Sequence, residues 1–218
     1  MSLRVLMVSD VYFPRVNGVS TSIETFRAAL PGFGVESELL APRYADEADI
    51  AGILRVPARK VPVDPEDRIM NWRRLREQAL ERAAACDLVH VQTPFAAHYA
   101  GLRAARALGK PVIATYHTFF EEYLYHYAPL LPRAALRALA RRFSRAQCNE
   151  LDAIVVPSTA MRDRLFEYGV RRPMHVLPTG IPLARFSAGD RARGRARLGI
   201  AGDRPVALYV GRVAHEKN

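Results

Sequence analysis

Half of the 218 residues are hydrophobic and a quarter are charged, a globular composition that excludes a disordered chain. The formal net charge is +10 and the sequence pI is about 10.1, so the surface attracts phosphate esters, anionic lipid or nucleic acid. The length suits one α/β domain with additional residues and is enough to bury a full core.

Cys86 and Cys148 lie far apart in the sequence and form no CxxC or metal-binding pattern. We therefore expect two free, buried thiols in a reducing cytosol. The apolar run 3–8 is too short for a signal peptide or a membrane span, and Asp10 follows it closely. These features predict a cytoplasmic protein.

Apolar stretches alternate with amphipathic ones along the chain. The patterns predict strands at 3–9, 36–41, 53–56, 87–92, 111–116, 152–157 and 174–177, and helices at 19–30, 67–85, 95–108, 132–149 and 159–168. This alternation predicts an α/β fold, a doubly wound Rossmann-like parallel sheet with helices on both faces. Ligands of such a sheet bind at the carboxyl ends of its strands.

Finer patterns within the helices predict one cap and two inward faces. Thr21 and Glu24 have the spacing of a capping box at the start of the first helix. The helix at 67–85 is expected to turn Leu75 and Leu80 inward. The helix at 132–149 is expected to bury the face bearing Leu136, Leu139 and Phe143.

The last forty residues differ in composition from the rest. Residues 179–203 are rich in Gly, Pro and Arg and predict a linker with one short helix near 191–198. Residues 205–210 predict a buried strand, which needs neighbours that the remaining sequence does not supply. We therefore expect three parts: a Rossmann-like domain at 1–179, a linker at 180–204, and the start of a truncated second domain at 205–218.

Asn17-Gly18 directly precedes the first helix, after the first strand. Glycine lets a ligand approach the backbone closely, and a helix N-terminus favours an anion through its unpaired N–H groups and its dipole. The segment is not GxGxxG, so it lacks the dinucleotide fingerprint. An ordinary strand-to-helix turn explains Asn-Gly equally well.

A second candidate site lies at 115–122, after the strand at 111–116. His117 can donate and accept hydrogen bonds near neutral pH, although a single histidine is more often structural than catalytic. Thr93 follows another strand end, and His90 within that strand is interpreted as a hydrogen-bonded core histidine. The candidates for lining a pocket are Asn17, Thr93, Tyr116 and Glu121. The histidines have no ligand spacing, so no metal site is expected.

Arginines recur every fourth residue along the helix at 132–149. Arg137, Arg141 and Arg145 form one basic stripe, which can face an anionic membrane surface or serve only as a solvated helix face. The chain lacks the aromatic motifs of RNA-binding domains and any helix-turn-helix pattern, so no nucleic-acid partner is expected.

Near the end of the chain, Gly211 is followed by Arg212 and Lys217. A glycine at a strand end with these two cations can clamp a diphosphate, because Arg supplies a planar fork and Lys a point charge.

Taken together, these segments resemble the N-terminal, acceptor-side half of a family 4 retaining glycosyltransferase of the GT-B fold, and most closely the glycolipid- and mannosyl-transferring members. The resemblance rests on the Phe-Pro loop with Gly18 before a helix, on Tyr116-His117-Thr118 with 153–158, and on 178–181 with 210–218. It covers essentially the whole chain, and the Gly-Arg…Glu-Lys segment is its most specific part.

The resemblance implies two Rossmann-like domains, with acceptor bound mainly by the first and a GDP- or UDP-hexose by the second. Gly18 would approach the donor diphosphate, and His117 would contact the donor sugar. Arg212 and Lys217 would hold the phosphates and stabilise the leaving nucleoside diphosphate, without a metal. The acceptor would be a lipid or a glycan.

Two departures from the family pattern stand out. Asn17 replaces the first of two glycines, and the paired-glutamate segment that binds the donor is missing. One reading is an acceptor domain that is nearly inactive alone. The alternatives are a non-catalytic acceptor- or membrane-binding module that pairs with a separate donor-domain chain, and another GT-B enzyme such as a sugar-nucleotide epimerase.

Overall fold

The computed structural model describes residues 2–48, 50–61, 64–117, 132–202 and 204–210. It divides into two compact units, residues 1–179 and 180–218, and each is described by itself. The strands of the first unit are β1 (Leu3–Val8), β2 (Val35–Pro42), β3 (Ile53–Val56), β4 (Ala58–Val61), β5 (Asp64–Met70), β6 (Leu88–Val91), β7 (Val112–Thr115), β8 (Ala153–Val156) and β9 (Met174–Val176). Its helices are α1 (Gly18–Ala29), the short 3-10 helix η1 (Leu30–Phe33), α2 (Trp72–Ala84), α3 (Ala96–Ala107), α5 (Arg133–Asn149) and α6 (Thr159–Glu167).

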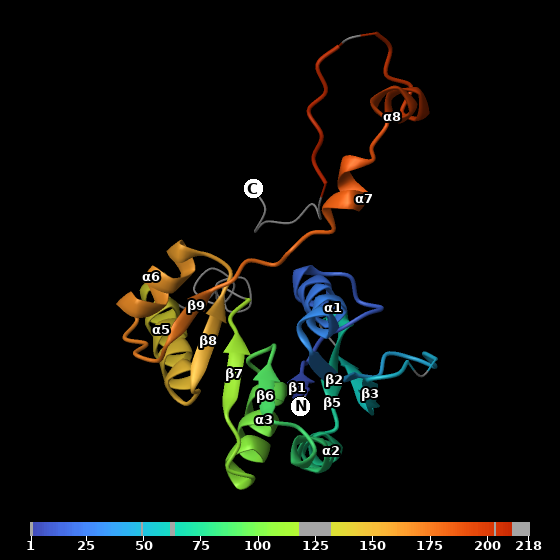
Figure 1. Ribbon diagram of the computed structural model, residues 1–218. Helices are drawn as coiled ribbons and strands as arrows, with labels where there is room; N and C mark the ends of the chain where they lie inside the picture. The colour runs from blue at the N-terminus through green and yellow to red at the C-terminus, as the bar shows by residue number, and fades with distance from the viewer. Residues whose placement is uncertain (1, 49, 62–63, 118–131, 203, 211–218) are drawn as a thin grey trace. The chain divides into compact units, whose positions relative to one another are not determined.

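Seven strands form one sheet in the order β3-β2-β1-β6-β7-β8-β9, and every pair is parallel (Figure 1). This confirms the predicted α/β, doubly wound sheet. β1 is flanked by β2 and β6, with Met7 level with Leu39 on one side and with His90 on the other. The chain order reverses between β1 and β6, and at such a switch point the loops that follow the two strands diverge and leave a crevice.

Strand β1 is buried on both faces, as a central parallel strand requires. Val5 and Met7 belong to a cluster with Ile23 of α1, whereas Leu6 and Val8 belong to a larger cluster with Leu75 of α2. The larger cluster also takes apolar residues from α3, α5 and α6. Both cysteines are buried and free, as expected.

The predicted helix at 67–85 begins too early. Residues up to Met70 belong to β5, which pairs antiparallel with β4 in a separate two-stranded sheet. The helix starts at Trp72 because the side chain of Asn71 caps it and accepts a hydrogen bond from the Arg74 amide. Leu75 is buried, but Leu80 is 44% exposed, so its inward placement was wrong. The charged spacing gave no sign of this hairpin.

Two further details correct the sequence interpretation. Asn17, not Thr21, caps α1, and Thr21 lies inside the helix with its hydroxyl donating to the Asn17 carbonyl. Glu24 instead accepts a hydrogen bond from the Tyr12 hydroxyl. On α5, Leu136 is buried but Leu139 is 56% exposed.

The second unit contains α7 (Leu183–Ser187), which was not predicted, and α8 (Arg191–Arg197), which was. Asp190 caps α8 by accepting a hydrogen bond from the Arg193 amide. Residues 205–210, predicted as a strand, make no strand pairing with any described residue. Val206, Leu208 and Val210 are exposed. An apolar run forms a strand only where it pairs with another strand, and no described residue pairs with this one.

Candidate functional site

The switch point between β1 and β6 is held together by Asp10. This residue lies two positions past the end of β1, and its carboxylate accepts hydrogen bonds from the Thr93 hydroxyl at 2.7 Å and from the Ala97 amide at 3.1 and 3.2 Å. The Asp10 amide in turn donates to the Thr93 hydroxyl at 2.7 Å. Helix α3 has no cap from its own Phe95, so Asp10 caps it from a neighbouring strand.

The Asp10 carboxylate is removed from water, although the residue as a whole is partly exposed. Desolvation raises its pKa from 3.8 to about 6, and the bonds from Thr93 and from the α3 amides oppose that rise. The carboxyl group therefore takes up a proton as the pH falls through about 6.

Replacing Asp10 with Asn should change how stability depends on pH. Because the folded pKa lies above the unfolded one, ionisation of Asp10 costs stability, and the wild type regains about 1 kcal/mol from this group between pH 7 and pH 5. D10N should lack that gain, as measured by urea unfolding at both pH values. The exposed Asp46→Asn is the control, and parallel pH dependences of D10N and wild type would contradict the assignment.

The first turn of α1 presents open backbone beside this link. Asn17 Oδ1 accepts the Ser20 amide at 2.8 Å, while the amides of Gly18 and Val19 have no partner among the described residues. A Cβ built on Gly18 would meet no atom within 4 Å. The protein itself therefore has no steric need for glycine at this position, which leaves close approach of a ligand as a reason for it.

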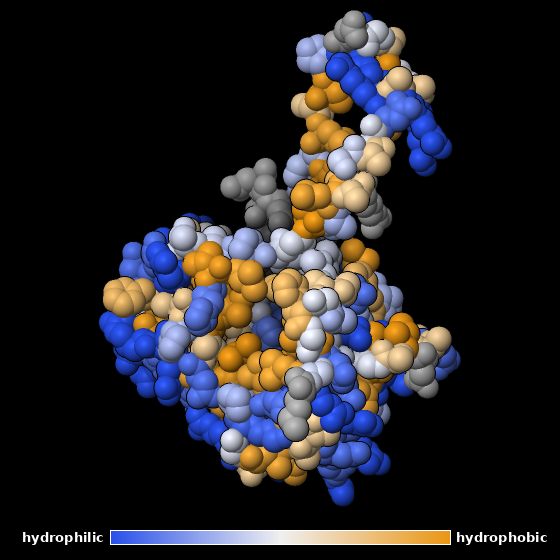
Figure 2. Space-filling view, in the orientation of Figure 1, coloured by the Kyte–Doolittle hydropathy of each residue, from blue (hydrophilic) through white to orange (hydrophobic). Residues whose placement is uncertain are grey.

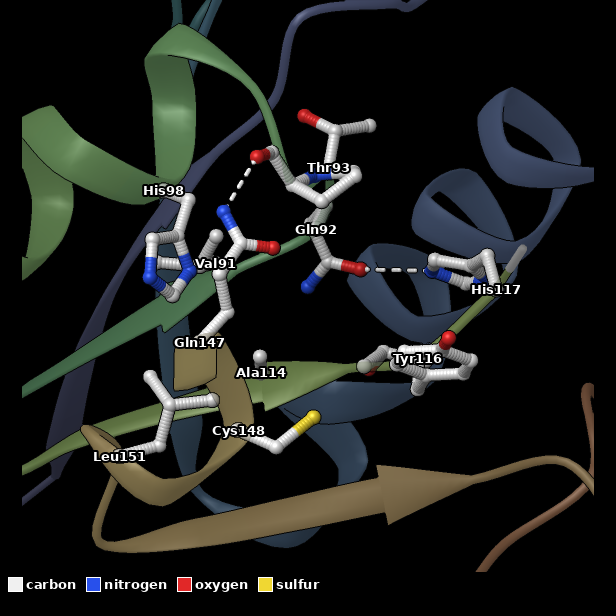
Figure 3. A pocket seen from close by; sticks show the side chains of 12 residues that line it. Val91, Gln92, Thr93, His98, Ala114, Tyr116, His117, Gln147, Cys148 and Leu151 are labelled. Carbon is white, nitrogen blue, oxygen red and sulfur yellow. Dashed lines mark hydrogen bonds between the residues drawn. The ribbon is translucent and has the colours of Figure 1, made fainter. Parts of the chain in front are cut away.

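His117 lies just past β7, and its Nε2 is 3.1 Å from Oε1 of the buried Gln92, which follows β6 (Figure 3). Burial lowers the pKa of His117 from 6.5 to about 4, so its ring is neutral at pH 7. The neighbouring Tyr116 directs its hydroxyl to Ser144 of α5, at 2.8 Å. His117 thus offers a neutral imidazole at the carboxyl edge of the sheet.

A cavity of about 30 Å³ lies beside these residues, with Gln92, Thr93, His117 and Gln147 among those lining it (Figure 3). That volume holds about one or two water molecules and is far too small for a sugar. Gln147 of α5 donates from Nε2 to the Pro94 carbonyl at 2.7 Å. The cavity belongs to the support beneath the candidate site, and a substrate would bind outside it.

Two further histidines are buried near the edge. His90 Nε2 lies 2.8 Å from the Thr115 hydroxyl, which confirms it as a hydrogen-bonded core histidine, and burial lowers its pKa to about 3. His98 of α3 is 2% exposed and lies 3.7 Å from the Glu150 carboxylate. Burial lowers its pKa as well, against the opposing effect of Glu150.

The predicted stripe of Arg137, Arg141 and Arg145 lies at exposed positions of α5, whereas Leu136 and Ala140 of the same helix are buried. Arg141, Arg142 and Arg145 line an open groove of about 800 Å³ together with Asn149 and Tyr168, and the Arg141 guanidinium lies over the Tyr168 ring. In Figure 2, hydrophilic side chains cover much of the surface on the side where α5 and α6 lie.

Within the described ranges, no cluster of three or more His, Cys, Asp or Glu side chains is suited to hold a metal ion. No helix in the same ranges has the length and apolarity needed to cross a bilayer.

Comparison with known proteins assigns the chain to a family. The model of Glycosyltransferase Family 4 matches residues 16–185. The chain belongs to this family. It is 33% identical to the alpha-monoglucosyldiacylglycerol synthase of Streptococcus pneumoniae, over 99% of the chain and 50% of that protein. It is 34% identical to a GDP-mannose-dependent alpha-mannosyltransferase of Mycobacterium tuberculosis, over 99% of the chain and 57% of that protein. The chain thus spans about half the length of the curated relatives it matches.

Solved structures agree on the fold of this family 4 chain. Anabaena HepE, solved in complex with UDP-glucose, matches 90% of the chain and 50% of its own length, with a TM-score of 0.59 and 15% identity. A glycosyltransferase of Rickettsia africae matches 94% of the chain and 51% of its own length, with a TM-score of 0.58 and 13% identity. The fold is the Rossmann-like fold of the N-terminal half of GT-B glycosyltransferases.

The structure brings some of the predicted site residues of this family 4 chain to one edge of the sheet. Gly18 follows the β1 loop, Thr93 follows β6, and Tyr116 and His117 follow β7. Asn17 caps α1 with its side chain. Glu121, Arg212 and Lys217 lie outside the described residues.

Sequence reasoning missed three residues that organise the edge: Asp10, Gln92 and Gln147. Asp10 and Gln92 lie within two residues of the end of a buried strand, and a polar residue at that position was the available signal. Gln147 lies within a helix whose pattern was dominated by arginine, and nothing in the sequence distinguished it.

Proposed function

We propose that this chain forms the acceptor-binding side of a retaining glycosyltransferase, which transfers a hexose from GDP- or UDP-hexose to a hydroxyl of a lipid or glycan. The placement of Gly18, Thr93 and His117 after the neighbouring strands β1, β6 and β7, at the carboxyl edge of the sheet, is the observation that carries the proposal. The names of the relatives, a diacylglycerol glucosyl-transferring synthase and a GDP-mannose-dependent enzyme, favour a lipid acceptor and a nucleotide-sugar donor.

The proposed chemistry needs three kinds of group. The open amides at the start of α1 bind a phosphate of the donor. His117, which is neutral at pH 7, accepts a hydrogen bond from a hydroxyl of the donor sugar. Arg212 and Lys217 supply positive charge to the leaving nucleoside diphosphate, so no metal is required.

In the retaining reaction, the acceptor oxygen bonds to the anomeric carbon on the face from which the diphosphate departs. The acceptor proton passes to a phosphate oxygen of the leaving group. The residues of this chain bind and orient the reactants, and none of them needs to become covalently attached to the sugar.

Substituting Gly18 tests the donor side of this proposal. Gly18→Ala should weaken the binding of UDP or GDP about tenfold or more, because a methyl group blocks close approach to the Gly18 and Val19 amides. Binding is followed from amide chemical shifts of the isotope-labelled chain during titration with each nucleotide. Gly32→Ala is the matched control, since its added Cβ would also meet no atom within 4 Å but lies in η1.

Two outcomes would overturn the donor assignment. One is that nucleotide leaves the 17–20 amides of the wild type unshifted at millimolar concentration. The other is that Gly18→Ala and Gly32→Ala bind equally well. We also expect the isolated chain to turn over nucleotide-sugar only at background rate, and robust transfer would refute the expectation that it is nearly inactive alone.

The groove lined by Arg141, Arg142 and Arg145 favours a second role. We propose that α5 docks on anionic lipid at the inner face of the cytoplasmic membrane, which would hold the chain beside a lipid acceptor. This role is also compatible with a non-catalytic module that pairs with a separate donor-domain chain. Co-sedimentation with anionic vesicles tests it.

A further inference from the structure

The orientation of the His117 ring can be traced through a set of hydrogen bonds that begins at a backbone carbonyl. The Pro94 carbonyl can only accept, so the Gln147 amide must turn its nitrogen toward it, which it does at 2.7 Å. The Gln147 oxygen then points the other way, into the cavity and toward the Gln92 side chain (Figure 3).

The Gln92 side chain lines the same cavity as that oxygen. Figure 3 shows the Gln92 amide nitrogen on the cavity side and its oxygen on the side of His117. The cavity of about 30 Å³ has room for a water molecule that bridges the Gln92 nitrogen and the Gln147 oxygen. The Gln92 backbone is itself fixed, since its amide donates to the Val8 carbonyl at 2.9 Å.

The His117 ring is the last member of the set. The Gln92 oxygen can only accept, so the hydrogen bond of 3.1 Å requires the proton of the imidazole to be on Nε2. Because burial keeps the ring neutral at pH 7, Nδ1 then carries a lone pair. No described residue donates to Nδ1.

His90 shows that burial alone does not impose this state. Its Nε2 lies 2.8 Å from the Thr115 hydroxyl, which can either donate or accept, so its contact permits both tautomers. The contact of His117 permits only the tautomer with the proton on Nε2, because its partner is a carboxamide oxygen, which can only accept.

We propose that Gln147 and Gln92 act as positioning residues that hold His117 with its proton on Nε2, so that Nδ1 accepts a hydrogen bond from a hydroxyl of the sugar substrate. The sugar assignment rests on the proposed glycosyltransferase function, whereas the tautomer does not. A histidine with the opposite tautomer would present a donor to the same hydroxyl and would select a different arrangement of the sugar.

The tautomer can be measured in the chain itself by long-range proton–nitrogen correlation spectra of ¹⁵N-histidine-labelled protein at pH 7. We expect a pyrrole-type nitrogen at Nε2 of His117 and a pyridine-type nitrogen at Nδ1. Gln92→Met should give a mixture of tautomers, and Gln92→Glu should restore the Nε2 proton because a carboxylate also accepts. Gln147→Met should loosen the preference, since it frees the Gln92 amide to turn.

Ser144→Ala is the matched control. Ser144 lies on α5 one turn from Gln147, and its hydroxyl bonds that of Tyr116, the neighbour of His117. It takes no part in the relay, by which we mean the set formed by Pro94, Gln147, Gln92 and His117. This variant should leave the tautomer unchanged. A proton on Nδ1 in the wild type, or an unchanged tautomer in Gln92→Met, would overturn the proposal.

Ligand titration separates the relay from the function. UDP-glucose and GDP-mannose should shift the His117 ring signals, and Gln92→Met should weaken nucleotide-sugar binding about tenfold while leaving nucleoside diphosphate binding unchanged. If the wild-type tautomer is as stated but neither nucleotide-sugar shifts the ring, the sugar assignment falls and the relay stands. If Gln92→Met binds both ligands as the wild type does, the role of the relay in sugar binding is refuted.

Discussion

Lowering the pH from 7 to 5 should destabilise the folded chain by roughly 3 kcal/mol. Burial lowers the pKa of His90 to about 3 and that of His117 to about 4, both from 6.5. Below pH 6.5 these two histidines bind protons in the unfolded chain but stay neutral in the folded one. Each therefore lowers the free energy of unfolding by about 2 kcal/mol by pH 5. Stability is therefore full above pH 6.5 and falls as the pH drops toward the folded pKa values.

Asp10 acts in the opposite direction but is outweighed. Its pKa is raised to about 6, so its protonation returns only about 1 kcal/mol over the same pH interval. His98, whose pKa is also lowered by burial, adds to the loss. Because three histidines oppose one carboxyl group, the net effect of lowering the pH is a loss of stability.

Urea unfolding at pH 7 and pH 5 measures the effect. His90→Gln should recover about 2 kcal/mol of the loss, because glutamine keeps a partner for Thr115 and does not titrate. His175→Gln, on the exposed part of β9, is the control and should follow the wild type. Equal losses in His90→Gln and wild type would show that acid acts through other groups.

Reversing the charge of Arg137, Arg141 and Arg145 together should reduce binding to anionic vesicles by about a hundredfold or more. Each arginine near a membrane surface contributes about 1 kcal/mol, and three glutamates add repulsion. The three residues are exposed on one side of α5, so the substitutions leave the core intact. Co-sedimentation with phosphatidylglycerol-containing vesicles at physiological salt measures the affinity.

The chain offers a control of identical net charge. Arg73, Arg74 and Arg76 are exposed on α2, which lies apart from α5 (Figure 1), and their replacement by Glu changes the net charge equally. This control should lose far less affinity. Equal losses of affinity in the two triple variants would mean that vesicle binding depends only on net charge. An unchanged affinity in the α5 variant would refute the proposed membrane role of this helix.

The order of strands and helices was predictable because each central strand is buried on both faces. Runs such as Leu88–Val91 are apolar enough to be recognised alone, and the helices between them keep clear caps or periodicity. The β4–β5 hairpin was missed because its residues are largely charged, and charge at that spacing also fits a solvated helix. The stretch 205–210 shows the reverse case, since an apolar run predicts a strand only where partners exist.

The site was predictable to the level of strand ends and no further. Gly18, Thr93 and His117 could be proposed because parallel strands end at one edge. Their hydrogen-bond partners could not be predicted. Asp10 bonds Thr93, which lies 83 residues away in the sequence, and Gln92 bonds His117, which lies 25 residues away. Which polar groups pair depends on the sheet order, and the sequence pattern does not contain it.

The capping of α3 by Asp10 has a consequence for the direction in which a ligand can lie. Two helices, α1 and α3, begin at the same crevice, and each would attract a negative group. Asp10 fills the positive end of α3, whereas the first amides of α1 stay open. An elongated substrate with one negatively charged end and one neutral end therefore binds in one direction only, with its charged end at α1. The Asp10 carboxylate therefore disfavours binding in the reverse direction. Its removal would leave the N-terminus of α3 free to compete with that of α1 for the charged end.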